Sequence, residues 1–180
     1  MFAYLIDKLY NYRYLNNLKG FTMSINSFLL GNKADNDIKT FLEFIKDLYR
    51  DNLMSVILFG SYAKKNAWTA SSDIDILIVL KNAPTGLKRY KSYFDSAAKH
   101  NFIYNYDVII LPLSAFNVPR GLMFDIAESG IALYDPQNIF KKINGTTMQW
   151  LKRRIIEKKN SGGHFYWRIN DAREVSGGLL

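Results

Sequence analysis

Three aspartates and one Gly-Ser pair are the residues of this chain whose types and spacing could do chemistry. Asp73 and Asp75 are separated by one residue at the start of the apolar run 74–80, so an extended backbone places both carboxylates on one face. Two like charges held that close disfavour each other's ionised form unless a cation lies between them. Mg²⁺ or Mn²⁺ suits the pair, because these hard ions take carboxylate oxygens and keep positions for water and substrate phosphates.

Gly60 and Ser61 follow the apolar run 56–59, which is too short for a helix and typical of a buried central strand. A glycine there lets backbone amides approach a phosphate, and the serine hydroxyl can donate to a phosphate oxygen. Lys64 and Lys65 lie close enough in sequence to add positive charge around a triphosphate. One strand is therefore expected to deliver phosphate donors, and the next strand to deliver metal ligands.

The elements that must position these residues follow from hydrophobic periodicity and turn residues. An apolar stripe predicts a helix from a cap at Asp35 or Asn36 to about residue 49, and a basic helix is expected over 85–100 with Leu87, Tyr90, Phe94, Ala97 and Ala98 as its inner face. The other expected elements are an N-terminal helix over 2–18, a loop over 20–35, strands over 74–80, 108–111 and 131–134, a helix over 120–128, a helix start at Asp135-Pro136, a basic helix over 147–159, and a strand or docking tail over 164–167.

This order of elements predicts an α/β (α+β) fold, with a small mixed sheet of about 4–5 strands flanked by helices. The expected division is an N-terminal helical extension (1–34), a core (35–135) and a C-terminal helical and basic region packed on that core (136–180). The aromatic cluster Phe165, Tyr166 and Trp167 is expected to pack onto the domain, although it could also stack on a base.

The amino-acid composition limits which kinds of catalytic and metal-binding site the chain can form. The chain has no cysteine and two histidines, which excludes disulfides, thiol catalysis and a cysteine-ligated zinc site, so metal chemistry must rest on carboxylates. Its 24 basic and 16 acidic side chains leave a formal charge of +8, which suits a polyanionic partner or simply keeps the chain soluble. No apolar run is long enough to span a membrane, and the N-terminal stretch does not read as a secretory signal, so a cytoplasmic protein is expected.

The motifs resemble the nucleotidyltransferase superfamily that includes DNA polymerase β, and in particular its minimal, bacterial and archaeal branch. That family carries Gly-Ser, a spacer of about ten residues, Asp-x-Asp before an apolar strand, and a third carboxylate on a later strand. Here Gly60-Ser61 precedes Asp73-Ile74-Asp75 by eleven residues, and Tyr106-Asp107-Val108 matches the later position. The spacer is about one residue longer than usual, and Lys65 stands where a glycine is common.

The resemblance covers about residues 36–135 and implies a polymerase β-like fold with Asp73, Asp75 and Asp107 as catalytic and metal-binding residues. Two ions roughly 4 Å apart would activate the attacking hydroxyl and neutralise the leaving pyrophosphate. The implied nucleotide-binding residues are Gly60, Ser61, Lys64, Lys65 and Ser72.

The implied activity is transfer of an NMP from an NTP, expected to be AMP from ATP, to a hydroxyl acceptor with release of pyrophosphate. Relatives of this size often act as antitoxins of helical HEPN-type toxins, so a protein acceptor is the first expectation, and a small molecule or an RNA 3′ end is the second. Two other classes stay open. One is a catalytically silent antitoxin, and the other is an RNA binder that uses the basic region 141–180.

Overall fold

The computed structural model describes residues 33–64 and 72–180, of which residues 37–180 belong to one compact unit. The helix expected over 2–18 lies outside the described residues, as does most of the loop expected over 20–35. Within the described ranges, no helix combines the length and the apolar character that a membrane crossing requires.

A four-stranded mixed sheet forms the centre of the unit. Strands β1 (Leu53–Leu58) and β2 (Ile74–Leu80) pair antiparallel, β4 (Ile131–Tyr134) pairs antiparallel with the other edge of β1, and β3 (Tyr106–Pro112) runs parallel to β2. The order is β3-β2-β1-β4, so β4 is an edge strand as its short apolar run predicted. The predicted fold class is confirmed.

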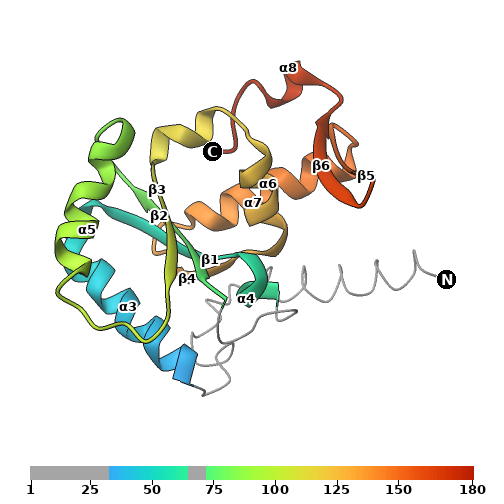
Figure 1. The fold of residues 1–180 in the computed structure, drawn as a ribbon. Coiled ribbons are helices and arrows are strands. Elements are labelled where there is room, and N and C mark those ends of the chain that lie inside the picture. The colour runs from blue at the N-terminus through green and yellow to red at the C-terminus, as the bar shows by residue number, and fades with distance from the viewer. Residues whose placement is uncertain (1–32, 65–71) are drawn as a thin grey trace. The chain divides into compact units, whose positions relative to one another are not determined.

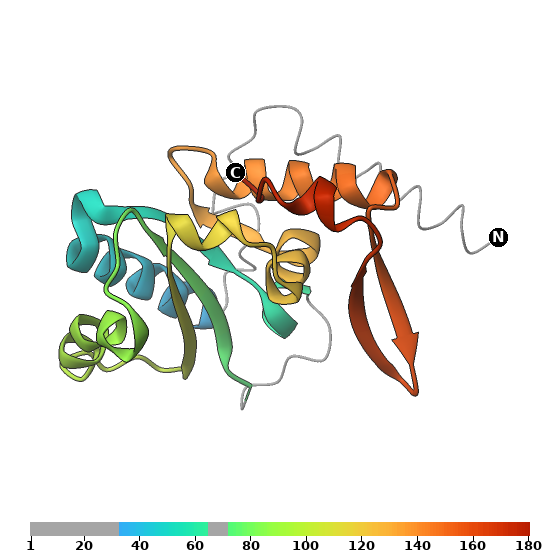
Figure 2. The same cartoon turned by 90° about the horizontal axis from the view of Figure 1, so that it is seen from above.

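Helices cover both faces of this sheet (Figures 1 and 2). On one face lie α3 (Lys33–Tyr49) and α5 (Lys91–Ala97), where the ring of Phe41 stacks on that of Tyr106 at a centroid distance of 3.9 Å. On the other face lie α6 (Gly121–Ser129) and α7 (Ile139–Lys152), which form one core with side chains of β1 and β2. The remaining short helices are η1 (Arg50–Asn52), α4 (Gly60–Lys64), η2 (Gly86–Tyr90), η3 (Leu113–Asn117) and α8 (Ala172–Val175).

The helix expected over 85–100 is broken into η2 and α5, and its predicted inner face is wrong for Leu87, Phe94 and Ala98, whereas Tyr90 and Ala97 are half-buried. Leu87 is 87% exposed and Phe94 is 63% exposed, whereas Tyr93 is the buried residue of α5. The change from 3-10 to α geometry alters the angle between successive side chains, so a stripe drawn with one helical period points away from the sheet.

The basic helix expected over 147–159 is wrong beyond Lys152. Helix α7 ends at Lys152, Arg154 adopts a positive φ of 57°, and the chain continues into strand β5 (Ile156–Ser161). Strand β5 pairs antiparallel with β6 (His164–Ile169), which confirms the strand alternative for residues 164–167. The two-residue connection Gly162-Gly163 has φ values of 59° and 85°, as the tightest hairpin turns require, so the glycines favour this hairpin over a helix.

Asp135 caps α7, but from further away than predicted. The helix begins at Ile139, so Pro136 is not its first residue. The Asp135 carboxylate nevertheless accepts hydrogen bonds from the backbone N–H groups of Ile139 (2.8 Å) and Phe140 (3.0 Å). These N–H groups have no partner within the helix, so the aspartate stabilises its start.

Candidate active site

Asp75 and Asp107 face each other across neighbouring parallel strands. The register of β2 and β3 pairs Asp75 directly with Asp107, and adjacent strands lie about 4.8 Å apart. Alternation puts Asp75 on the same face as Leu77 and Val79, which is the face that α6 and α7 cover. The apolar side chains fill the core, and the two carboxylates come at the starts of the strands, at the margin of that core.

Gly60 brings the turn after β1 against Asp75. Its φ is +69°, and a Cβ built on it would lie 1.8 Å from Asp75 Oδ2. The backbone N–H of Phe59 donates to the Asp75 carbonyl oxygen at 3.0 Å, and the backbone N–H of Ser61 donates to the Asp75 carboxylate. The glycine is thus required by its approach to a carboxylate, a reason that the sequence motif alone does not reveal.

The electrostatics of Asp75 indicate which charges gather around it. Burial raises the pKa of Asp75 above its usual range, and the nearby charges of Asp107 and then Asp73 raise it further. The Ser61 N–H bond and the charge of Lys64 act in the opposite direction on the same pKa. Asp73, Asp75, Asp107 and Lys64 therefore belong to one electrostatic neighbourhood.

Lys65 and Ser72 are the two other residues predicted to bind the nucleotide. Lys65 lies outside the described residues. Ser72 is partly buried next to Asp73 in the chain, and its contact with a nucleotide stays a prediction.

The oxygen ligands present suit a metal ion that arrives with a nucleotide. No group of three His, Cys, Asp or Glu side chains in residues 33–64 and 72–180 is gathered closely enough to hold an ion alone. Mg²⁺ is commonly bound through only one or two carboxylates and completes its shell with water and substrate phosphates. The mutual repulsion that raises the pKa of Asp75 is the feature a cation would relieve.

Asp37 is a residue that motif reasoning missed. Its buried carboxylate accepts hydrogen bonds from the backbone N–H groups of Ile103 (3.0 Å) and Tyr104 (3.3 Å) and from the hydroxyl of Tyr106 (2.9 Å). It thereby fastens the segment that leads into β3, one residue before Asp107. In the sequence Asp37 reads as an ordinary first-turn acid of a helix, so no local signal could have revealed this contact.

Of the three aromatic side chains at residues 165–167, one packs onto the domain and two are exposed. Trp167 packs onto α6, where its Nε1–H donates to Asp125 Oδ1 at 3.0 Å. Phe165 and Tyr166 are largely exposed, so the expectation that all three rings pack onto the domain is wrong for these two.

In this mixed sheet, Asp75 faces Asp107 on the neighbouring strand, and Gly60 and Ser61 lie against Asp75. This arrangement is the one that defines the nucleotidyltransferase class of site. The family model described as "Polymerase beta, Nucleotidyltransferase" matches residues 37–139, more than half of the chain. The chain therefore belongs to the polymerase beta nucleotidyltransferase family.

Two Methanocaldococcus jannaschii proteins, each named as a candidate protein adenylyltransferase, are similar in sequence. MJ1305 is 39% identical over 80 residues, which cover 44% of this chain and 52% of that protein. MJ0141 is 38% identical over 76 residues, which cover 42% of this chain and 73% of that protein. The chain thus spans about half the length of the first of these relatives.

Solved structures show a more distant likeness. A toxin-antitoxin structure with AMP-PNP is 22% identical, with a TM-score of 0.45 over 66% of this chain and 89% of that chain. A complex of a tri-AMPylated Shewanella oneidensis HEPN toxin with an MNT antitoxin is 19% identical, with a TM-score of 0.45 over 66% of this chain and 87% of that chain.

Proposed function

We propose that this chain transfers AMP from ATP to a hydroxyl group of a protein acceptor and releases pyrophosphate, in a reaction that depends on Mg²⁺ or Mn²⁺. The observation that carries the proposal is the pairing of Asp75 with Asp107 in register, with Gly60 and Ser61 closed against Asp75. The polymerase beta family match and two relatives named as candidate protein adenylyltransferases support the same reaction.

In this reaction the acceptor oxygen forms a bond to the α-phosphorus of ATP, and the bond from that phosphorus to the oxygen bridging the β-phosphorus breaks. The proton of the acceptor hydroxyl passes to the Asp107 carboxylate, which is exposed and therefore open to an incoming acceptor. Asp73, Asp75 and Asp107 would contribute oxygen ligands to metal ions whose shells water and the ATP phosphates complete, and the charge of those ions would neutralise the leaving pyrophosphate. Lys64 supplies positive charge at the same place, as its effect on Asp75 indicates.

For the acceptor, we propose a HEPN-type protein as the first candidate. The minimal branch that the Gly60-Ser61 and Asp73-Ile74-Asp75 pattern resembles includes antitoxins of such helical toxins. The relatives named as candidate protein adenylyltransferases also favour a protein over a small molecule or RNA.

The test is incubation of the purified chain with α-labelled ATP, Mg²⁺ and a lysate of its host. We expect label on a protein, and we expect Asp73→Asn combined with Asp75→Asn to reduce it about 100-fold or more, because the charge-stabilising groups are lost. Asp95→Asn is the matched control, since this exposed aspartate pairs with Lys91 on α5. Chelation with EDTA should abolish labelling, and added Mg²⁺ or Mn²⁺ should restore it. Undiminished labelling by the double variant would rule out the proposed site.

A further inference from the structure

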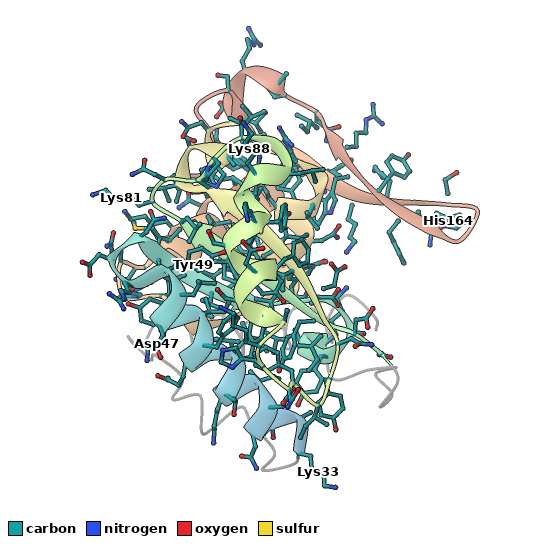
Figure 3. The ribbon with its side chains drawn as sticks, turned by 60° about the vertical axis from the view of Figure 1, so that its left-hand side comes forward. Lys33, Asp47, Tyr49, Lys81, Lys88 and His164 are labelled. Carbon is teal, nitrogen blue, oxygen red and sulfur yellow. The ribbon has the colours of Figure 1, made fainter. Side chains whose placement is uncertain are left out.

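The hairpin of β5 and β6 extends beyond the body that carries the active site. Its strands pair along their whole length, from Ile156 with Ile169 to Ser161 with His164, and Figure 3 shows His164 at a free tip. Among the described strands, neither pairs with a third. Figures 2 and 3 both show the tip on the side of the unit where β2 begins, which is where Asp73 and Asp75 lie.

The base of the hairpin is fastened to α6. The Trp167 ring meets Phe124 edge-on at 5.4 Å in addition to its hydrogen bond with Asp125, and Lys158 forms an ion pair with Glu128. Ile156 is fully buried in the core that α6 and α7 share with the sheet. Helix α6 also packs against α4, which begins with Gly60. The hairpin is therefore held in a set position relative to the candidate active site.

The distal half of the hairpin exposes two aromatic rings, although the Lys158 ammonium lies over one of them, that of Phe165, at 5.7 Å from its centroid. Phe165 is 68% exposed and Tyr166 is 50% exposed. As neighbours on one strand they point to opposite faces, so a single covering layer within the chain could not bury both. Exposed aromatic side chains on a projecting element are typical of anchors for a partner, because they bury a large area with little loss of rotamer freedom.

The charges of the hairpin favour a protein partner over a nucleic acid. Residues 160–167 contain neither Lys nor Arg. Nearer the base, Lys158 pairs with Glu128, and Lys159 pairs with Glu157 at 2.7 Å. Nucleic-acid surfaces draw most of their affinity from several unpaired cations on phosphates, and the distal hairpin offers none. Arg168 is exposed on the face of Tyr166, so it complements a carboxylate at the rim of an apolar contact.

We propose that this hairpin is the docking arm for the protein acceptor, with its distal half held in an apolar groove of the acceptor that covers Phe165 on one face and Tyr166 on the other, and whose acidic rim meets Arg168. The proposal rests on the proposed nucleotidyl transfer. It adds that the acceptor is selected by a surface outside the catalytic carboxylates. Loss of the arm should therefore weaken acceptor binding and leave ATP binding unchanged.

The experiment compares the full chain with Phe165→Ala combined with Tyr166→Ala, in the labelling assay with α-labelled ATP and lysate. We expect labelling at low lysate concentration to fall about tenfold or more, which is the usual effect of removing an aromatic anchor. More lysate should restore the labelling, because docking affects acceptor affinity. The shift in Tm caused by ATP with Mg²⁺ should equal that of the wild type. The matched control is Leu87→Ala combined with Phe94→Ala, which removes two apolar side chains at η2 and α5 that are even more exposed than one or both of the hairpin rings, and it should leave labelling unchanged.

The outcomes separate this inference from the function on which it rests. Equal labelling by the hairpin variant and the wild type would overturn the docking arm and leave the transfer activity intact. Absence of label with the wild type would overturn the proposed function and the inference with it. Two further results would also overturn the inference. One is a labelled product that ribonuclease destroys, which makes the occupant RNA. The other is a dimer that sedimentation detects for the wild type and does not detect for the hairpin variant. In that case the occupant of the hairpin is a second copy of this chain.

Discussion

At the scale of single residues, the approach of Gly60 to Asp75 is the tightest constraint in the site. Gly60→Ala should destabilise the fold and displace Asp75, because a Cβ would meet Asp75 Oδ2 at 1.8 Å. A left-handed conformation alone costs a non-glycine residue about 1–2 kcal/mol. Gly86→Ala isolates that cost, since Gly86 has a φ of +60° and a Cβ added there would meet no neighbouring atom within 4 Å.

Urea denaturation and the labelling assay measure the two glycine variants. We expect Gly86→Ala to lose about 1–2 kcal/mol and keep its labelling activity, and Gly60→Ala to lose more stability and most of its label. Equal losses for the two variants would show that the contact with Asp75 is unimportant.

The carboxylate of Asp75 makes the stability of the chain depend on pH. Burial and the charges of Asp107 and Asp73 raise the pKa of Asp75 in the folded chain above its unfolded value, so the folded chain binds this proton more tightly. Stability from this group is therefore present at low pH and decreases as the pH rises through its raised pKa. Without divalent cations, Asp75→Asn should have a higher Tm than the wild type at pH 7, and the gap should narrow at acidic pH.

Thermal unfolding from pH 4 to pH 8, with and without Mg²⁺, tests this expectation. Mg²⁺ should raise the Tm of the wild type more than that of Asp75→Asn, because the cation relieves a repulsion that the variant lacks. A lower Tm for Asp75→Asn at pH 7 would contradict the assignment.

At the scale of elements, β3 owes its position to α3. Asp37 accepts three hydrogen bonds from the segment before Asp107. Asp37→Ala should destabilise the fold by about 2–4 kcal/mol, because buried donors that lose their acceptor cost about 1–3 kcal/mol each and some will recover water. Tyr106→Phe removes one of these bonds and keeps the ring stacked on Phe41, so it should cost about 1 kcal/mol.

Denaturation of both variants, with labelling measured under conditions where they remain folded, separates stability from positioning. We expect Asp37→Ala to lose label even when fully folded, since the start of β3 carries Asp107. Full activity of the folded Asp37→Ala variant would show that the register of β2 and β3 suffices on its own.

At the scale of the whole unit, the C-terminal segment packs against η3 and adds Leu179 to the core that contains side chains of α6 and α7. Leu179 is buried in that core, and its backbone N–H donates to the Phe116 carbonyl oxygen at 2.9 Å. Leu179→Ala should cost about 2–5 kcal/mol, as large-to-small changes in cores do. Leu180→Ala is the neighbouring control, because Leu180 is exposed and its loss should stay within about 0.5 kcal/mol. Urea denaturation of the two variants decides between these outcomes, and equal losses would refute the core position of Leu179.

Local pattern alone determined the four strands of the central sheet, the fold class and the order of the site residues. The runs 74–80 and 131–134 match β2 and β4 residue for residue, because a short apolar run bounded by polar residues has few other ways to bury itself. The motif order also indicated that the strand before Gly60-Ser61 and the strand after Asp73 are neighbours, and β1 and β2 do pair antiparallel.

Tertiary structure decided what depends on contacts distant in sequence. The anchoring of β3 by Asp37, the exposure of Leu87 and Phe94, and the hairpin in place of a basic helix all depend on which surfaces other elements leave available. Helical periodicity predicts which side chains share one face of a helix, but it does not show whether another element packs on that face. A polar helix and a polar hairpin also have similar amino-acid compositions, so composition does not distinguish them. The order of Gly60-Ser61, Asp73, Asp75 and Asp107 could thus be read from the sequence, whereas the pairing of Asp75 with Asp107 and the β5–β6 hairpin docked on α6 depend on the tertiary structure.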